Sequence, residues 1–298
     1  MTQQRVVVAG SSGLIGSALV ASLSADGAEV VRLVRRPARA ADEVEWLTDG
    51  RPLDPGVLDG ADAVVGLNGA SIARLPWTSG YRRTLHRSRI EPARVLATAL
   101  ARLGAGAPAF LSGSAVGIYG DRPGERLDES SATGSTFLAG LCQEWEAAAR
   151  AVAPHSRVVL LRTAPLLHRR GVLRPMLTLT RLGLAGPLGS GRQIWPWISL
   201  DDEVRAIRHL IGADIDGAVN LCGPVPATAN DIGRGLARAM HRPYLLPAPA
   251  WALRTALGDA ADSLLLPDAD VRPRALIDSG FVFAHETYQQ ALTAELAD

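Results

Sequence analysis

Three glycines at three-residue spacing, Gly10, Gly13 and Gly16, come directly after a short β-branched run at residues 5–9. An apolar helical pattern follows them, so the local context is a strand, a tight turn and a helix. The first-turn N–H groups of such a helix have no helical acceptor, and together with the helix dipole they attract phosphate oxygens. Glycine at these places lets the chain turn, lets a pyrophosphate approach and lets the helix pack closely. The stretch therefore predicts a dinucleotide-binding turn made of Gly10, Ser11, Ser12, Gly13, Leu14, Ile15 and Gly16.

Two arginines, Arg35 and Arg36, end the second β-branched run at residues 28–34. A protein that binds NAD usually has Asp or Glu at this strand end, where the carboxylate accepts from the adenosine ribose 2′-hydroxyl. A guanidinium instead favours a 2′-phosphate through charge-assisted hydrogen bonds. The position predicts NADP(H) as the cofactor, and the alternative is that both arginines are a solvated strand end.

Small residues also end later apolar runs. Asn68, Gly69 and Ala70 follow the run at 63–67, and such a turn would let a ribose and a pyrophosphate lie close to the strand end. Pro165 lies just beyond the run at 157–162. We assign these four residues to the cofactor side as well.

These residues need a sheet to position them. Strands are expected near 5–9, 28–34, 44–46, 63–67, 109–112, 157–162 and 219–221, and helices over 77–101, 137–152, 200–210 and 229–240. Alternating strands and crossover helices from residue 5 to 165 predict an α/β fold, a right-handed, doubly wound parallel Rossmann sheet. We expect a domain over 1–243, in which 166–200 and 222–243 contribute to the substrate side, and a small C-terminal helical domain over 244–298. Trp195 and Trp197 would either line the substrate cover or pack in the core.

Composition limits the function. The net charge is +1, which gives no case for nucleic-acid or membrane binding. The two cysteines fit neither a disulfide framework nor a zinc site, and the six histidines show no metal spacing. No apolar run reaches the ~18 residues of a membrane span. Because the N-terminus enters a strand at once, we expect no signal peptide and a cytoplasmic protein, monomeric or homodimeric. All 31 basic residues are arginine, which excludes chemistry that needs lysine.

Across residues 5 to about 240 the sequence resembles the extended short-chain dehydrogenase/reductases, the NAD-dependent epimerase/dehydratase family. It is also similar, over nearly the whole chain, to a narrower branch that ends in a short domain of unknown function. The stretches that carry this likeness are 10–16, Ser88-Arg89, 114–121, 137–139 with Trp145-Glu146, 191–193 with Trp197-Ile198, and 264–281. The resemblance implies that Arg89 belongs to the cofactor-binding residues, and the alternative is that Arg89 lies with the other arginines of the helix over 77–101 on a solvated face.

The same resemblance implies an atypical catalytic site. The superfamily uses a Ser or Thr after the fifth strand and a Tyr-x-x-x-Lys on the next helix, where tyrosinate is the acid/base and lysine lowers its pKa. Ser114 stands at the serine position, while Leu138 and Cys142 stand at the helix position. Since the chain contains no lysine, the usual proton shuttle is missing in any alignment register.

Two functions stay open. The first is an NADP(H)-dependent oxidoreductase or epimerase-like enzyme that acts on a small carbonyl or sugar-type substrate. Ser114 would hold the substrate, and proton transfer would fall to Tyr119, Asp121, a glutamate such as Glu144, or water. The alternative for Tyr119 is a packed aromatic in its turn. The second function is an NADP(H)-binding sensor or regulatory module with little catalysis.

Overall fold

The computed structural model describes residues 3–48 and 50–297 and confirms the doubly wound parallel sheet. Its strands are β1 (Arg5–Ala9), β2 (Glu29–Val34), β3 (Glu43–Glu45), β4 (Ala63–Gly66), β5 (Ala109–Ala115), β7 (Val158–Thr163) and β9 (Gly217–Leu221). They lie in the order β3-β2-β1-β4-β5-β7-β9, and each neighbouring pair is parallel. The strand order reverses between β1 and β4, and this place is the switch point of the sheet. Ligands of such sheets bind at the switch point, beyond the carboxyl ends of the strands.

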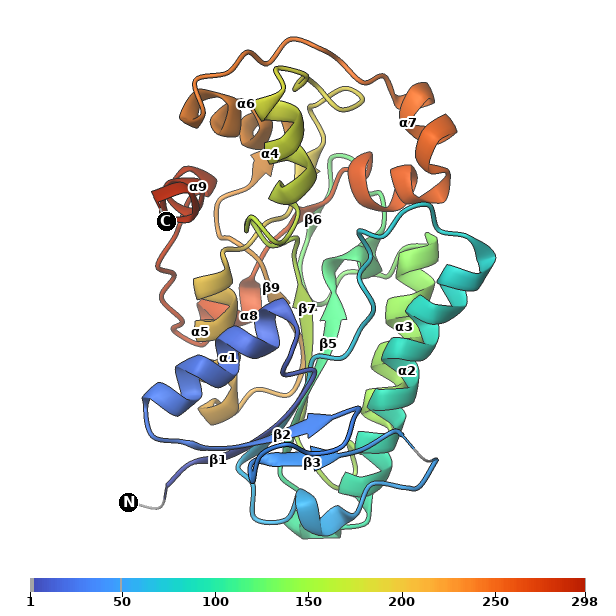
Figure 1. Ribbon diagram of the computed structural model, residues 1–298, viewed down its shortest axis with the longest axis vertical. Coiled ribbons are helices and arrows are strands. Elements are labelled where there is room, and N and C mark those ends of the chain that lie inside the picture. Colours follow the sequence, from blue (N-terminus) through green and yellow to red (C-terminus); the bar gives the residue numbers. More distant parts are fainter. Residues whose placement is uncertain (1–2, 49, 298) are drawn as a thin grey trace.

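Helices cover both faces of the sheet (Figure 1). α1 (Leu14–Ala25) and α5 (Leu200–Gly212) pack on one face, and α2 (Ser79–Ala101) and α3 (Phe137–Arg150) pack on the other. Successive residues of β1 point to opposite sides, so Val6 and Val8 join the first layer while Val7 joins the second. This two-sided burial explains why the strands read as continuous apolar runs. At α5 the helix begins as expected, because the Ser199 hydroxyl accepts from the Asp202 N–H at 3.0 Å.

The remaining elements are η1 (Pro55–Val57), η2 (Gly104–Gly106), η3 (Val116–Tyr119), β6 (Arg126–Leu127), α4 (Leu173–Arg181), β8 (Ile194–Trp195), β10 (Ala227–Thr228), α6 (Ala229–Ala239), α7 (Ala250–Leu257), η4 (Ala261–Leu265), β11 (Asp270–Val271), α8 (Arg274–Asp278) and α9 (Tyr288–Ala297). Of these elements, η1 and η2 lead into β4 and β5 at their amino ends, and most of the others lie beyond the carboxyl ends of the strands (Figure 1). β8 pairs with β10, and β11 pairs with β6.

The residues from 244 onward pack against the parallel sheet and also against the elements beyond its carboxyl ends. β11 extends β6, α8 packs beside β9, and α9 packs on α6. The boundary at 243/244 stays a prediction. Among residues 3–48 and 50–297, no helix is both long enough and apolar enough to cross a membrane.

Candidate functional site

The glycine turn lies between the ends of β1 and β4 and opens α1. Gly10 has a φ of +84°, and a Cβ there would lie 2.7 Å from the Leu67 carbonyl group. A Cβ at Gly16 would lie 2.2 Å from the Gly10 carbonyl oxygen. Gly13 is the residue before α1, and in the described chain no side chain caps this helix. The turn therefore leaves a helix N-terminus open toward the switch point, as a bound pyrophosphate requires.

The two arginines at the end of β2 have different surroundings. Arg36 donates to the Glu43 carboxylate through Nη1 and Nη2, each at 2.7 Å. This contact lowers the pKa of Glu43 to about 2. Arg35 is exposed, and its side chain makes no hydrogen bond or ion pair within residues 3–48 and 50–297. Only Arg35 is thus fully available to a ligand at this strand end.

The turn after β4 is held by Ser88 and Arg89, two adjacent residues of α2. The Ser88 hydroxyl accepts from the Ala70 N–H at 2.9 Å, and Arg89 Nη2 donates to the Ala70 carbonyl at 3.0 Å. A Cβ at Gly69 would lie 3.1 Å from Arg89 Cζ, so the turn and the guanidinium are in close contact. Asn68 is buried, and its Oδ1 has no hydrogen-bond partner in the described chain. The structure thus brings Asn68, Gly69, Ala70 and Arg89 together beside β4.

Ser114 belongs to a buried ionic network. Its hydroxyl donates to Glu146 Oε1 at 2.7 Å, and Arg162 binds the same carboxylate through Nε at 2.8 Å and Nη2 at 3.1 Å. The partly exposed Arg150 also donates to Glu146, at 3.1 Å. Because a hydroxyl has one proton, Ser114 in this arrangement can only accept from a ligand.

Tyr119 lies deeper in the same network. It is fully buried, and its hydroxyl donates to Asn220 Oδ1 at 2.7 Å and accepts from Arg162 at 2.8 Å. Burial raises the pKa of Tyr119 to about 12. The network continues to the C-terminal part, because Asn220 Nδ2 donates to the Arg272 carbonyl at 3.0 Å. The geometry is that of a packed tyrosine, the alternative considered for this residue.

Sequence reasoning did not anticipate Arg162 and Asn220, and it noted Glu146 only as part of the family likeness. Ser114, Arg162 and Asn220 are register neighbours on β5, β7 and β9, so their side chains share one face of the sheet. A signal was present, because each is a polar residue within an otherwise apolar strand. Their pairing depends on strand order, which local patterns do not encode.

The helix position that faces this network holds no acid or base. Leu138 and Cys142 are both buried on α3, and burial raises the pKa of the Cys142 thiol to about 12. A second buried acid lies on the other side of β7. Glu203 accepts from the Thr163 hydroxyl at 2.7 Å, its Oε2 has no partner in the described chain, and burial raises its pKa to about 8.

The tryptophans are packed rather than open to a ligand. Trp195 and Trp197 are buried in a cluster with α4, α6 and α9, and their indoles donate to the carbonyls of Leu265 and Val225, each at 3.0 Å. Pro165 is exposed at the end of β7, where its carbonyl accepts from the Ile198 N–H at 3.2 Å.

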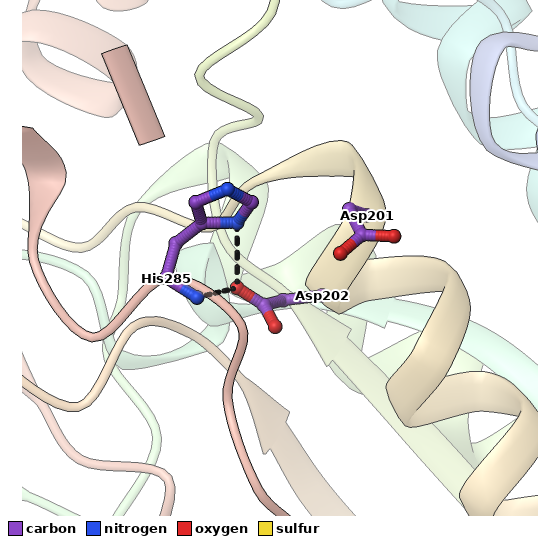
Figure 2. A group of neighbouring side chains, drawn as sticks. All are labelled: Asp201, Asp202 and His285. Carbon is purple, nitrogen blue, oxygen red and sulfur yellow. Dashed lines mark hydrogen bonds and ion pairs between the residues drawn. The ribbon is translucent and has the colours of Figure 1, made fainter. Parts of the chain in front are cut away.

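One cluster has the donor types of a metal site, Asp201, Asp202 and His285 (Figure 2). Asp202 is buried, and its carboxylate accepts from the N–H groups of Ala284 at 2.7 Å and His285 at 3.0 Å. In Figure 2 the dashed lines join His285 to Asp202, and none reaches Asp201. The Asp202 carboxylate fastens the segment before α9 to the start of α5.

Comparison with known proteins agrees with this geometry. The model of the NAD dependent epimerase/dehydratase family matches residues 6–222, and that of a domain of unknown function matches residues 248–295. Epimerase family protein Mb2239 of Mycobacterium bovis is 43% identical over 98% of this chain and 97% of its own. Epimerase family protein YfhF of Bacillus subtilis is 30% identical over 98% of each chain. The crystal structure of human epimerase family protein SDR39U1 with NADPH has a TM-score of 0.89 and 29% identity, covering 99% of this chain and 100% of that one. The chain therefore belongs to the NAD-dependent epimerase/dehydratase family.

Proposed function

We propose that this protein binds NADP(H) across the switch point and acts as an atypical oxidoreductase on a small carbonyl or sugar-type substrate. The observation that carries the proposal is the glycine turn, in which Cβ atoms at Gly10 and Gly16 would strike backbone while the N-terminus of α1 stays open. The human relative SDR39U1 was solved with NADPH, which supports the same cofactor class here.

Residues at the ends of four strands, β1, β2, β4 and β7, would hold the cofactor. The turn 10–16 binds the pyrophosphate, and Arg35 binds the 2′-phosphate, because Arg36 is already paired with Glu43. Asn68, Gly69, Ala70, Arg89 and Pro165 lie on the side of the nicotinamide half. When bound, the cofactor supplies hydride chemistry.

Ser114 would orient the substrate. Because its proton is donated to Glu146, the Ser114 oxygen accepts from a substrate hydroxyl, or from the hydroxyl that forms when a carbonyl substrate is reduced. The proton of the reacting hydroxyl would then pass to water, since Tyr119 is enclosed in the buried network. Trp195 and Trp197 would not contact the substrate. They would support the substrate side by packing in the buried cluster beneath it.

The second candidate is an NADP(H) sensor or regulatory module with little turnover. It is favoured by one specific observation: the hydroxyls of Ser114 and Tyr119 both have protein partners. A site that satisfies its own polar groups needs no substrate to complete it.

Two measurements test these functions. NADPH should raise the melting temperature more than NADH does, and an equal response to both would remove the case for Arg35. NADPH oxidation is then followed over a panel of aldehydes, ketones and keto-sugar nucleotides. Turnover that is lost in Ser114→Ala supports the enzyme, whereas tight NADPH binding without turnover on any compound supports the sensor.

A further inference from the structure

Arg89 carries a partly buried positive charge without a counter-charge. Its Nη1 donates to the Leu85 carbonyl at 3.0 Å and its Nη2 to the Ala70 carbonyl at 3.0 Å. Its guanidinium lies over the Trp145 ring, with Cζ 5.4 Å from the ring centroid. Within residues 3–48 and 50–297 no carboxylate forms an ion pair with Arg89, and its Nε donates to no described group.

The ionisable groups that act on Arg89 do not neutralise it. They are Cys142 and Tyr81, and the loss of hydration on burial outweighs both of them, so that the pKa of the Arg89 guanidinium is lowered. The Cys142 thiol, whose pKa burial raises to about 12, is neutral at pH 7, and the Tyr81 hydroxyl donates to the Ser71 carbonyl at 2.6 Å. The contrast with Arg162 is direct, because that buried guanidinium is bound by the Glu146 carboxylate. The charge of Arg89 is therefore left for a ligand.

The position of Arg89 decides which part of the ligand it meets. The adenosine half of a dinucleotide lies over the β1–β2–β3 side of such a sheet, and the other half lies over the strands beyond the reversal. Arg89 holds the turn at Gly69 and Ala70, which ends β4 on that second side. Arg89 and Arg35 therefore lie on opposite sides of the switch point.

We propose that Arg89 binds the nicotinamide-bearing half of the cofactor and makes the site prefer NADPH over NADP⁺. The free N–H groups would donate to ribose or carboxamide oxygens, which are the acceptors in this half. The nicotinamide ring is cationic in NADP⁺ and neutral in NADPH, so an uncompensated guanidinium beside it repels the oxidised form only. This inference rests on the proposed cofactor.

The experiment measures dissociation constants by calorimetry for NADPH, NADP⁺ and adenosine 2′,5′-bisphosphate, which lacks the nicotinamide half. The variants are Arg89→Met, which keeps most of the apolar stem but not the charge, and Arg89→Lys, which keeps the charge. Arg87→Met is the matched control, because Arg87 lies on the same helix with a side chain that is 79% exposed.

We expect Arg89→Met to weaken NADPH about tenfold and the bisphosphate by less than about twofold, as the loss of charged hydrogen bonds to one half predicts. NADP⁺ should be weakened less than NADPH, so the preference for NADPH shrinks, and Arg89→Lys should retain that preference. Equal weakening of NADPH and the bisphosphate would show that Arg89 only holds the turn and would overturn the proposal. So would unchanged binding of all three probes, or an unchanged ratio of NADPH to NADP⁺ affinity. If the unmodified protein binds no NADPH, the proposed function itself fails.

Discussion

The buried pair of Arg162 and Glu146 makes the sharpest stability prediction. The Glu146 side chain is 1% exposed and that of Arg162 is 6% exposed, so neither charge reaches bulk water. In Arg162→Met the carboxylate keeps only Arg150, whose side chain is 49% exposed, and the Ser114 hydroxyl. Leaving a buried charge without its main partner costs about 3–5 kcal/mol of unfolding free energy.

A double variant separates the pair energy from the loss of packing. Arg162→Met with Glu146→Leu removes both charges and restores apolar contact, so it should recover about 2 kcal/mol or more relative to the single variant. Arg150→Met is the control, and its effect should stay below about 1 kcal/mol because this pair is half exposed.

The assay is urea unfolding followed by tryptophan fluorescence and circular dichroism, with the midpoint and slope fitted for each variant. If Arg162→Met costs under about 1 kcal/mol, or if the costs of the two single changes simply add in the double variant, the network is not coupled. Our account of how Ser114 is oriented would then be wrong.

Three other changes test separate parts of the site. Arg35→Ala should remove most of the NADPH preference over NADH in a fluorescence titration, while NADH binding should hardly change because it has no 2′-phosphate. Gly16→Ala should abolish nucleotide binding, since its Cβ would lie 2.2 Å from the Gly10 carbonyl oxygen, whereas Gly212→Ala, with nothing within 4 Å, should bind normally. Glu203, whose pKa burial raises to about 8, keeps its proton on folding while the unfolded chain releases it above its ordinary pKa. Stability should therefore fall between about pH 4.5 and 8, by at most about 1.4 kcal/mol per pH unit, and thermal melts of Glu203→Gln should lack that part of the slope.

The elements could be predicted because their signals are local. Each of the seven expected strands is a strand of the sheet, and the four later helices that the patterns indicated are α2, α3, α5 and α6. A strand buried on both faces must be apolar throughout, so a short β-branched run identifies it without knowledge of its neighbours. The glycine turn is local in the same way, because strand, turn and helix follow one another within residues 5–25.

The partners of the candidate catalytic residues could not be predicted. Ser114 meets Glu146 from a helix 32 residues later, and the Tyr119 hydroxyl meets Asn220 across 101 residues. No spacing rule links such positions, since they become neighbours only when α3 packs on β5 and when β9 aligns with β7 in register. For the same reason the sequence could not distinguish a substrate cover from core packing for Trp195 and Trp197.

The sequence by itself determined that a Rossmann sheet forms, that a glycine turn opens its first helix, and that no lysine can take part in the chemistry. The physical reason is that apolar periodicity, backbone freedom and side-chain composition are properties of short segments. Tertiary structure alone decided which polar groups are already satisfied. In the folded protein Arg36 binds Glu43, whereas Arg35 remains available to a ligand. Arg162 binds Glu146, whereas Arg89 has no counter-charge. Those assignments depend on distances of about 3 Å between residues on different elements, because hydrogen bonds form only at such distances.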